Sequence, residues 1–471
     1  MDNTEKTYDK EVVDDSLIIS TNEEKIFEGK EIEFNYGIVC WGDLEFDDCI
    51  IHIDGTSDDT GILVETYGRL TIKNCKVIGS NSEHAYFVRC NEQSTIRIKD
   101  TIFEECAYFL TGTPFRTLIK RCTFKNCSDG FFNTTVSLSN EMDITDSFMI
   151  NDRSIDELEC SEPERTADNR SILEKAGFDP YKEEDIKYFV ETCRQLAEEQ
   201  SNNNLDGCSG ILKIDGDGKV CFNNVYFYQN TKINDIPGFG AFVCCHNLNI
   251  RYEKCTFEGL TFGLNGQFFR SCRFEKCSDW MEGDFDHCLF HDCTKMIRTG
   301  LGDIVKCCDF ISCRDQLILM NNNSLIDNCF FKDIKNDDDF ADSIIVEYPE
   351  EDSFKTEIRS CVFDGIEIMN KYLIATGNDA FRDNQGINRA YVDNCIFKNY
   401  NSGNGSLIKT DALCTSSNSQ YDMIIIYDCE GIDYDIDDSL ENRGKKLSLG
   451  AERTVDHETG SSLEREHSND L

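Results

Sequence analysis

Cysteines at repeated spacing are the residues in this sequence that first suggest chemistry. The 471-residue chain contains 26 of them, and the segments CTFKNC, CRFEKC, CLFHDC and CDFISC are near copies of one pattern. Clustered thiols can bind zinc, usually from paired knuckles on turns, or an iron–sulfur cluster. Neighbouring thiols can also form disulfides. A third alternative is that the cysteines pack as small hydrophobic side chains.

The residues around the cysteines favour packing. Fourteen short frames align on one anchor position, which is Cys in eleven of them. A large apolar or aromatic residue stands three positions before every anchor, and a Phe stands two positions after the anchor in ten frames. The anchor and the Phe share one side of a strand because side chains alternate with period two. We therefore expect both to face a core in which the thiols are reduced and bind no metal. The anchors are Cys49, Cys75, Thr101, Cys122, Ser147, Val225, Cys255, Cys272, Cys288, Cys308, Cys329, Cys361, Cys395 and Cys429.

The residue just before each anchor indicates a sharp bend. The apolar residue three positions before the anchor has the wrong parity to lie on the same strand face, so the chain must turn between the two. Asn or Asp precedes the anchor in eight frames, including Asp48 and Asn74. Both residue types tolerate left-handed backbone angles. Each frame therefore predicts a strand, a one-residue corner and a second strand, with both strands facing inward.

The spacing between frames varies from 16 to 78 residues while the core pattern persists. Loops of different length leaving a fixed coil are typical of a β-helix, in which equivalent residues of successive coils stack about 4.8 Å apart. Crossovers between parallel strands are right-handed. From about Ile32 to Asp435 the chain resembles the right-handed parallel β-helix, or pectate-lyase-like, superfamily. The predicted fold class is an all-β, single-stranded right-handed parallel β-helix solenoid with a small helical insertion.

Four parts are expected along the chain. Residues 1–30 predict an N-terminal segment or cap, 31–436 the parallel β-helix, 151–206 a helical insertion that interrupts it, and 437–471 a disordered acidic tail. Asp179-Pro180 is typical of a helix start inside the insertion. The insertion either packs back on the rod or docks a protein partner. The apolar face of its main helix, and so the predicted partner-binding residues, would contain Ile186, Phe189, Val190 and Cys193.

The resemblance directs a search for catalytic residues. It implies clustered Asp with Ca²⁺ and a basic residue for a lyase, or three Asp with His and an Arg-x-Lys string for a hydrolase. Arg97-Ile98-Lys99 matches that string, but Ile98 is the core residue of the Thr101 frame, so the repeat accounts for it. Lys and Arg are scarce, which poorly suits an anionic substrate. No catalytic residue is assigned, and the sequence favours no enzymatic activity.

Metal and cofactor signals are also weak. Asp433-x-Asp435-x-Asp437 begins like an EF-hand loop but lacks the Gly and Glu that such a loop requires. No cofactor is expected beyond loose Ca²⁺ binding by acidic loops. His287 and His291 flank core cysteines with outward parity, so we expect them on the surface rather than as metal ligands.

The net charge of −42, from 89 acidic and 47 basic residues, argues against binding nucleic acid or an anionic membrane. The N-terminal residues contain no secretion signal, and no apolar run could span a membrane, so a cytoplasmic location is expected. Our first hypothesis is a non-enzymatic intracellular scaffold whose extended acidic surface binds a protein, which would be basic. The alternative is a carbohydrate-binding or carbohydrate-cleaving β-helix. A minor alternative is an acidic rod that mimics DNA and binds a DNA-binding protein.

Overall fold

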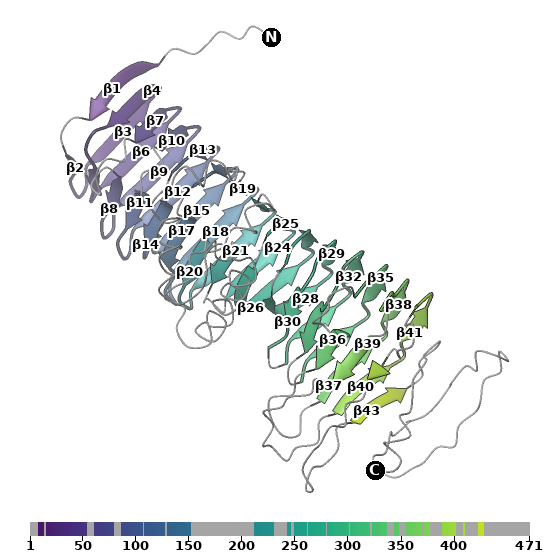
Figure 1. The fold of residues 1–471 in the computed structure, drawn as a ribbon. Coiled ribbons are helices and arrows are strands. Elements are labelled where there is room, and N and C mark those ends of the chain that lie inside the picture. The colour runs from purple at the N-terminus through teal and green to yellow at the C-terminus, as the bar shows by residue number, and fades with distance from the viewer. Residues whose placement is uncertain are drawn as a thin grey trace, which may run out of the picture.

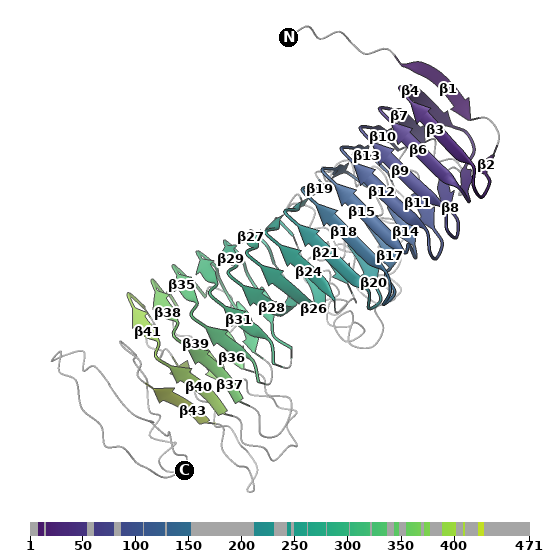
Figure 2. The same cartoon turned by 180° about the vertical axis from the view of Figure 1, so that it is seen from behind.

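The computed structural model describes most of the chain as a rod of stacked coils (Figure 1). The residues that it describes are 8–13, 16–53, 61–79, 86–106, 108–127, 130–151, 212–229, 243–245, 249–260, 262–278, 280–300, 302–320, 323–336, 343–347, 355–368, 372–376, 389–401, 408–409 and 423–427. Every helix or strand within these ranges is a β-strand, and all strand pairs are parallel. Strand β1 lies at one end of the rod and β43 at the other, as the reverse view also shows (Figure 2).

Each coil contributes one strand to each of three ladders, which we name sheets A, B and C. Sheet A has fifteen strands and is a separate sheet. Its strands carry the segment that follows the anchor, and they are β1 (Asp9–Val13), β4 (Lys30–Phe34), β7 (Ile50–Ile53), β10 (Lys76–Ile78), β13 (Ile102–Glu104), β16 (Thr123–Lys125), β19 (Phe148–Asn151), β22 (Tyr226–Gln229), β25 (Thr256–Glu258), β27 (Arg273–Glu275), β29 (Leu289–His291), β32 (Asp309–Ile311), β35 (Phe330–Lys332), β38 (Val362–Asp364) and β41 (Ile396–Lys398).

Sheets B and C are joined at β26 (Phe262–Arg270) and β28 (Met281–Asp286), which run through both without a turn. The other strands of sheet B are β2 (Leu17–Ile19), β5 (Ile38–Cys40), β8 (Ile62–Val64), β11 (Tyr86–Cys90), β14 (Tyr108–Gly112), β17 (Gly130–Thr135), β20 (Leu212–Asp215), β23 (Val243–Cys245), β30 (Ile297–Arg298), β33 (Ile318–Met320), β36 (Ser343–Glu347), β39 (Tyr372–Thr376) and β42 (Ile408–Lys409). Those of sheet C are β3 (Glu24–Glu28), β6 (Asp43–Asp47), β9 (Arg69–Lys73), β12 (Thr95–Lys99), β15 (Arg116–Lys120), β18 (Glu141–Thr145), β21 (Lys219–Asn223), β24 (Ile250–Glu253), β31 (Ile304–Lys306), β34 (Leu325–Asp327), β37 (Lys355–Arg359), β40 (Arg389–Asp393) and β43 (Met423–Tyr427).

A single left-handed residue separates sheet C from sheet A in each coil, which confirms the predicted corner. Such a residue turns the chain while leaving the next side chain directed inward. The corner residues from the third coil to the last described one all have φ between 50° and 56°; they are Asp48, Asn74, Asp100, Arg121, Asp146, Asn224, Lys254, Ser271, His287, Cys307, Asn328, Ser360 and Asn394. We name their stack the corner ladder. A second left-handed corner at the other end of many sheet A strands, such as Asn126 or Asp292, was not predicted.

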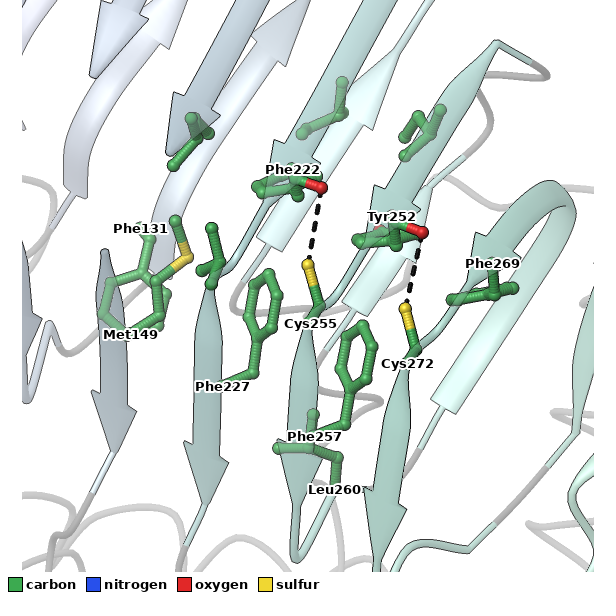
Figure 3. Packing of buried hydrophobic residues seen from close by; sticks show 14 of the residues in the cluster. Phe131, Met149, Phe222, Phe227, Tyr252, Cys255, Phe257, Leu260, Phe269 and Cys272 are labelled. Carbon is green, nitrogen blue, oxygen red and sulfur yellow. Dashed lines mark hydrogen bonds between the residues drawn. The ribbon is translucent and has the colours of Figure 1, made fainter. Parts of the chain in front are cut away.

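The core is built from like residues stacked on like residues. The Phe rings of sheet A stack face to face, with centroids of Phe227, Phe257 and Phe274 4.8 and 4.9 Å apart. The anchor cysteines are buried beside them. The Cys255 Sγ donates a hydrogen bond to the Phe222 carbonyl at 3.4 Å, and the Cys272 Sγ to the equivalent carbonyl one coil on (Figure 3). These contacts confirm that the Cys-x-Phe repeat faces the core.

The predicted fold class, an all-β parallel β-helix, is confirmed. The register also places Arg97 beside Thr71 and Ile98 beside Ile72, so the Arg-x-Lys string is part of the repeat, as predicted. The proposed helical insertion, the EF-hand-like acids and the Cys429 frame lie outside the described residues. Within the described ranges, none of the elements is a helix of the length and apolarity that crossing a membrane requires.

Candidate functional site

A cleft of about 390 Å³ lies on the outer surface where sheet C turns into sheet A. Its wall consists of four successive residues of the corner ladder: Arg121, Asp146, Asn224 and Lys254. Its floor consists of the residues two positions after each of these, at the beginning of strands β16, β19, β22 and β25. The cleft therefore spans four coils, which the strand spacing makes roughly 14 Å long.

The floor of the cleft carries two aromatic rings between two threonines. The register pairs Thr123 with Phe148, Phe148 with Tyr226, and Tyr226 with Thr256. Phe148 is 48% exposed, and its ring centroid lies 6.1 Å from that of Tyr226. The Tyr228 ring lies almost parallel to Tyr226 at 6.3 Å. Phe148 and Tyr226 on the floor, with Tyr228 beside them outside the lining, form an aromatic platform.

Tyr226 is held in place by a charged partner. Its hydroxyl donates a hydrogen bond of 2.6 Å to Glu258 Oε2. Partial burial and this hydrogen bond raise the pKa of Tyr226 above its ordinary value. The phenol therefore remains protonated at neutral pH, and turning the ring away would break a charge-assisted hydrogen bond.

The wall of the cleft is polar and mixed in charge. Asn224 Nδ2 donates to Asp146 Oδ1 at 2.9 Å. Arg121 donates two hydrogen bonds, of 2.6 and 2.7 Å, to the carboxylate of Asp100, and this pairing holds the pKa of Asp100 below its usual range. Lys254 forms no ion pair within the described part of the chain. Asp146 is the one carboxylate among the described residues of the lining.

A group of cations that we name the basic stripe lies next to the Arg121 end of the cleft. It comprises the six basic side chains on the outward positions of β9, β12 and β15, namely Arg69, Lys73, Arg97, Lys99, Arg116 and Lys120. The register stacks Lys73, Lys99 and Lys120 in one column. Like charges side by side on neighbouring strands are unfavourable, so an anion bound over this column would relieve a repulsion built into the fold.

Carboxylates neutralise the basic stripe mainly at its far edge. Arg69 and Lys73 form ion pairs of 2.8 Å with acids of the neighbouring strand β6. Arg97, Arg116 and Lys120 have no ion pair with any residue that the structure describes. The stripe therefore has unpaired positive charge at the end that adjoins the cleft, in a protein whose net charge is −42.

The sequence did not point to this site. The predicted partner-binding residues Ile186, Phe189, Val190 and Cys193 lie outside the described residues. His287 has an exposed side chain, as expected. The aromatic residues at outward positions, Phe148, Tyr226 and Tyr228, were a weak signal, because the repeat places Thr or a charged residue at only some of the equivalent positions and apolar residues such as Ile102 and Ile396 at others. In the part of the chain that is described, no group of three or more metal-ligating side chains occurs.

Comparison with known proteins found likeness in structure alone. No protein-family model matches the chain, and no curated protein matches its sequence. Two solved structures are similar. One is the catalytic domain of a GH87 alpha-1,3-glucanase in complex with tetrasaccharides, 10% identical, covering 91% of this chain and 70% of its own, with a TM-score of 0.29. The other is an alginate lyase, 10% identical, covering 96% of this chain and 87% of its own, also with a TM-score of 0.29. The parallel β-helix fold of the chain rests on its own strand topology.

The first functional hypothesis needs correction. Both similar structures are named as carbohydrate-cleaving enzymes, which contradicts the prediction of a non-enzymatic scaffold for a protein partner, and that prediction is wrong. The prediction took the absence of catalytic sequence motifs as a sign that the protein is not an enzyme. In a β-helix, side chains that work together come from different coils, so a linear string need not exist. Because the likeness at this identity concerns the fold alone, any function has to be argued from the cleft and the stripe.

Proposed function

We propose that this β-helix binds an acidic polysaccharide, with one segment of the glycan in the cleft and its continuation along the basic stripe. The observation that carries the proposal is the aromatic platform, in which Phe148 and Tyr226 lie on the cleft floor and Tyr228 extends it beyond the lining. Binding sites for small molecules and oligosaccharides combine apolar and aromatic surface with a few placed polar groups. Here the polar groups are the amide, carboxylate and cations of the wall.

The basic stripe supports an acidic rather than a neutral glycan. Of its three unpaired cations, Lys120 directly precedes Arg121 of the cleft wall, Arg116 lies at the other end of the same strand, and Arg97 lies one coil further away. The scarcity of Lys and Arg in the sequence argued against an anionic ligand, but that argument counted residues over the whole chain. The register concentrates six of the cations on three adjacent strands, and the local charge is what a ligand meets.

The surroundings of the site favour a glycan over a nucleic acid. Acids of β6, including Asp43 and Glu45, border the stripe on one side, and Glu141 and Asp143 of β18 border it on the other. A phosphodiester chain carries a charge on every nucleotide but few hydroxyl groups, so it has little to bond to these acids. A polysaccharide offers hydroxyl groups that can bond to the same carboxylates. The expected absence of nucleic-acid and membrane partners stays a prediction.

A binding assay tests the proposal. Calorimetric titration would compare acidic oligosaccharides containing uronic acid with neutral ones of equal length. We expect acidic oligosaccharides to bind and Phe148→Ala to weaken binding by tenfold or more, since aromatic anchors dominate binding energy. Ile396→Ala is the matched control, because Ile396 takes the equivalent outward position of β41, is 39% exposed against 48% for Phe148, and lies away from both the cleft and the basic stripe.

Lys120→Gln and Lys254→Gln should weaken the binding of acidic oligosaccharides and leave the binding of neutral ones unchanged. Added salt should reduce the difference in affinity between the wild-type protein and these variants. Binding that is unchanged in Phe148→Ala would overturn the proposal, as would tighter binding of single-stranded nucleic acid at the same residues. Chromatography of the oligosaccharide after incubation reads out cleavage in the same experiment.

A further inference from the structure

Three exposed aromatic side chains lie where sheet B turns into sheet C. Trp41 lies between β5 and β6, Tyr67 lies between β8 and β9, and Phe115 directly precedes β15. Their exposed fractions are 41%, 70% and 44%. We name these three residues the aromatic ridge. Apolar side chains that gather on one part of a surface mark binding sites, so the ridge is a candidate for one.

The register of sheet C places the ridge along one corner of the rod. Strands β6, β9, β12 and β15 pair in that order. Trp41 and Tyr67 each stand two residues before the sheet C strand of their coil, and Phe115 stands one residue before its strand. Since coils are about 4.8 Å apart, Trp41 and Tyr67 are separated by about 5 Å along the rod, and Phe115 lies about 10 Å beyond Tyr67. The three side chains therefore belong to one surface.

Tyr67 has a backbone conformation that its residue type disfavours. Its φ is 67°, in the left-handed region that a bulky residue rarely adopts. The equivalent corner of the first coil is occupied by Asn22, with φ of 69°, and both corners contain the same hydrogen-bonded turn. The Tyr67 side chain is mostly exposed, so packing in the core does not account for an aromatic residue here. Strained backbone without a packing reason is typical of functional positions.

Strand β15 connects the ridge to the cleft. Phe115 directly precedes the five residues of β15, and Arg121 of the cleft wall directly follows them. Arg116 and Lys120, at the two ends of β15, have exposed side chains and belong to the basic stripe, whose three strands lie side by side (Figure 1). The ridge and the cleft are therefore about 20 Å apart, with cations between them.

This order of groups suits an acidic glycan. The C–H face of a sugar packs against an aromatic ring, and an arginine binds a carboxylate through two parallel N–H bonds. Arg116, which forms no ion pair within the described part of the chain, directly follows Phe115. A neutral glycan would leave this cation unpaired, and a second copy of the chain would bring a net charge of −42 against an equal one. A uronic acid chain satisfies both the ring and the cation.

We propose that the aromatic ridge is the far end of the glycan site, so that an acidic polysaccharide crosses the rod over β15, from the cleft to Phe115 and Tyr67. This inference rests on the proposed function and adds a direction and a length to it. The polysaccharide runs across the rod rather than along its axis. Oligosaccharides too short to cross sheet C occupy the cleft alone, and longer ones also contact the ridge.

A series of oligosaccharide lengths tests the proposal. Uronic acid oligomers from the trisaccharide to the octasaccharide would be titrated calorimetrically into the wild-type protein, Phe115→Ala and Phe148→Ala. The affinity lost in Phe148→Ala should be similar at every length, because each oligomer needs the platform. The affinity lost in Phe115→Ala should grow with length and reach about tenfold for the octasaccharide, as for an aromatic anchor. A loss in Phe115→Ala that does not depend on length would contradict the crossing path.

Tyr67→Asn separates a binding role from a structural one. Asn tolerates the left-handed corner better than Tyr, so this variant should unfold at the same urea concentration as the wild type or at a higher one. It should nevertheless bind the octasaccharide roughly fivefold more weakly. Tyr36→Asn is the matched control, because Tyr36 is 52% exposed but lies between β4 and β5, where sheet A turns into sheet B. Its octasaccharide affinity should equal that of the wild type.

Trp41 reports on the ridge directly. In Trp280→Phe it is the remaining one of the chain's two tryptophans. Its fluorescence emission should shift when the octasaccharide binds and stay the same when the trisaccharide binds. Emission that the octasaccharide leaves unchanged would place the glycan away from the ridge.

Failure of this proposal differs from failure of the proposed function. If acidic oligomers bind and need Phe148, while Phe115→Ala and Tyr67→Asn match the wild type at every length, the ridge proposal is wrong and the proposed function stands. If no acidic oligomer binds, both are wrong. A concentration-dependent dimer in sedimentation that Tyr67→Asn abolishes, with unchanged glycan affinity, would assign the ridge to a second copy of the chain and refute the proposal.

Discussion

The stacked Phe column of sheet A leads to a prediction about how stability is distributed along the rod. Phe310 is fully buried, and its ring lies face to face with Phe290 and with Phe331 at 4.6 Å on each side. Truncating a buried Phe to Ala typically lowers the free energy of unfolding by about 3–5 kcal/mol. Because Phe310→Ala also removes two ring pairs, each contributing about 0.5–1.5 kcal/mol, we expect a loss at the upper end, about 5 kcal/mol.

The loss of unfolding free energy should depend on where a Phe lies in the stacked Phe column of sheet A. Phe397 stacks on one described ring, Phe363, at 4.9 Å, so Phe397→Ala loses one ring pair where Phe310→Ala loses two. We expect a loss of about 3 kcal/mol for Phe397→Ala. Phe310→Leu keeps most of the apolar volume and should lose less than Phe310→Ala.

Urea unfolding measured by tryptophan fluorescence tests the prediction. The chain has two tryptophans, Trp41 in the early coils and Trp280 nearer Phe310. Single-tryptophan variants, Trp41→Phe and Trp280→Phe, would report the two regions separately. Because coils of a solenoid contact only their neighbours, Phe310→Ala should shift the Trp280 transition more than the Trp41 transition. Equal losses for Phe310→Ala and Phe397→Ala, or a loss below about 1 kcal/mol for Phe310→Ala, would refute this reasoning.

Three further predictions concern single side chains. Ser271 has φ of 53°, so Ser271→Val should lower stability by about 1–2 kcal/mol in thermal unfolding, while Ser271→Gly should not. Arg121 lowers the pKa of Asp100. The pairing therefore stabilises the fold fully above the ordinary Asp pKa of about 3.9, and this stabilisation is lost as the pH falls through the lowered pKa. In a plot of melting temperature against pH, Asp100→Asn should reduce the slope on the acid side, and an unchanged slope would contradict the pairing. The pKa of Tyr226 is raised, so its phenol should ionise above the usual pKa of about 10. In an ultraviolet titration, Tyr226→Phe should remove absorbance that appears only above that pH. Removal of absorbance that appears at or below about pH 10 would contradict the prediction.

The sequence by itself determined the interior of this protein. Side chains alternate between the two faces of a strand, and this alternation is a local property of the backbone. Cys at the anchor and Phe two positions later must therefore face the same side wherever the strand lies. The left-handed corner is also local, because Asn and Asp tolerate it within a single residue. These two local rules, repeated from coil to coil, were enough to predict the parallel β-helix. They could not reveal the second corner, where Glu105, Lys276 or Ser312 takes the left-handed conformation that other coils assign to Asn, Asp or Gly.

The surface was decided only by the tertiary structure. Lys73, Lys99 and Lys120 are separated by 26 and 21 residues in the sequence, yet they form one column. Phe148 and Tyr226 are 78 residues apart, and they share the floor of one cleft. Loop lengths vary from coil to coil, so only the register of hydrogen bonds between coils decides which outward side chains meet, and that register is a property of the folded rod.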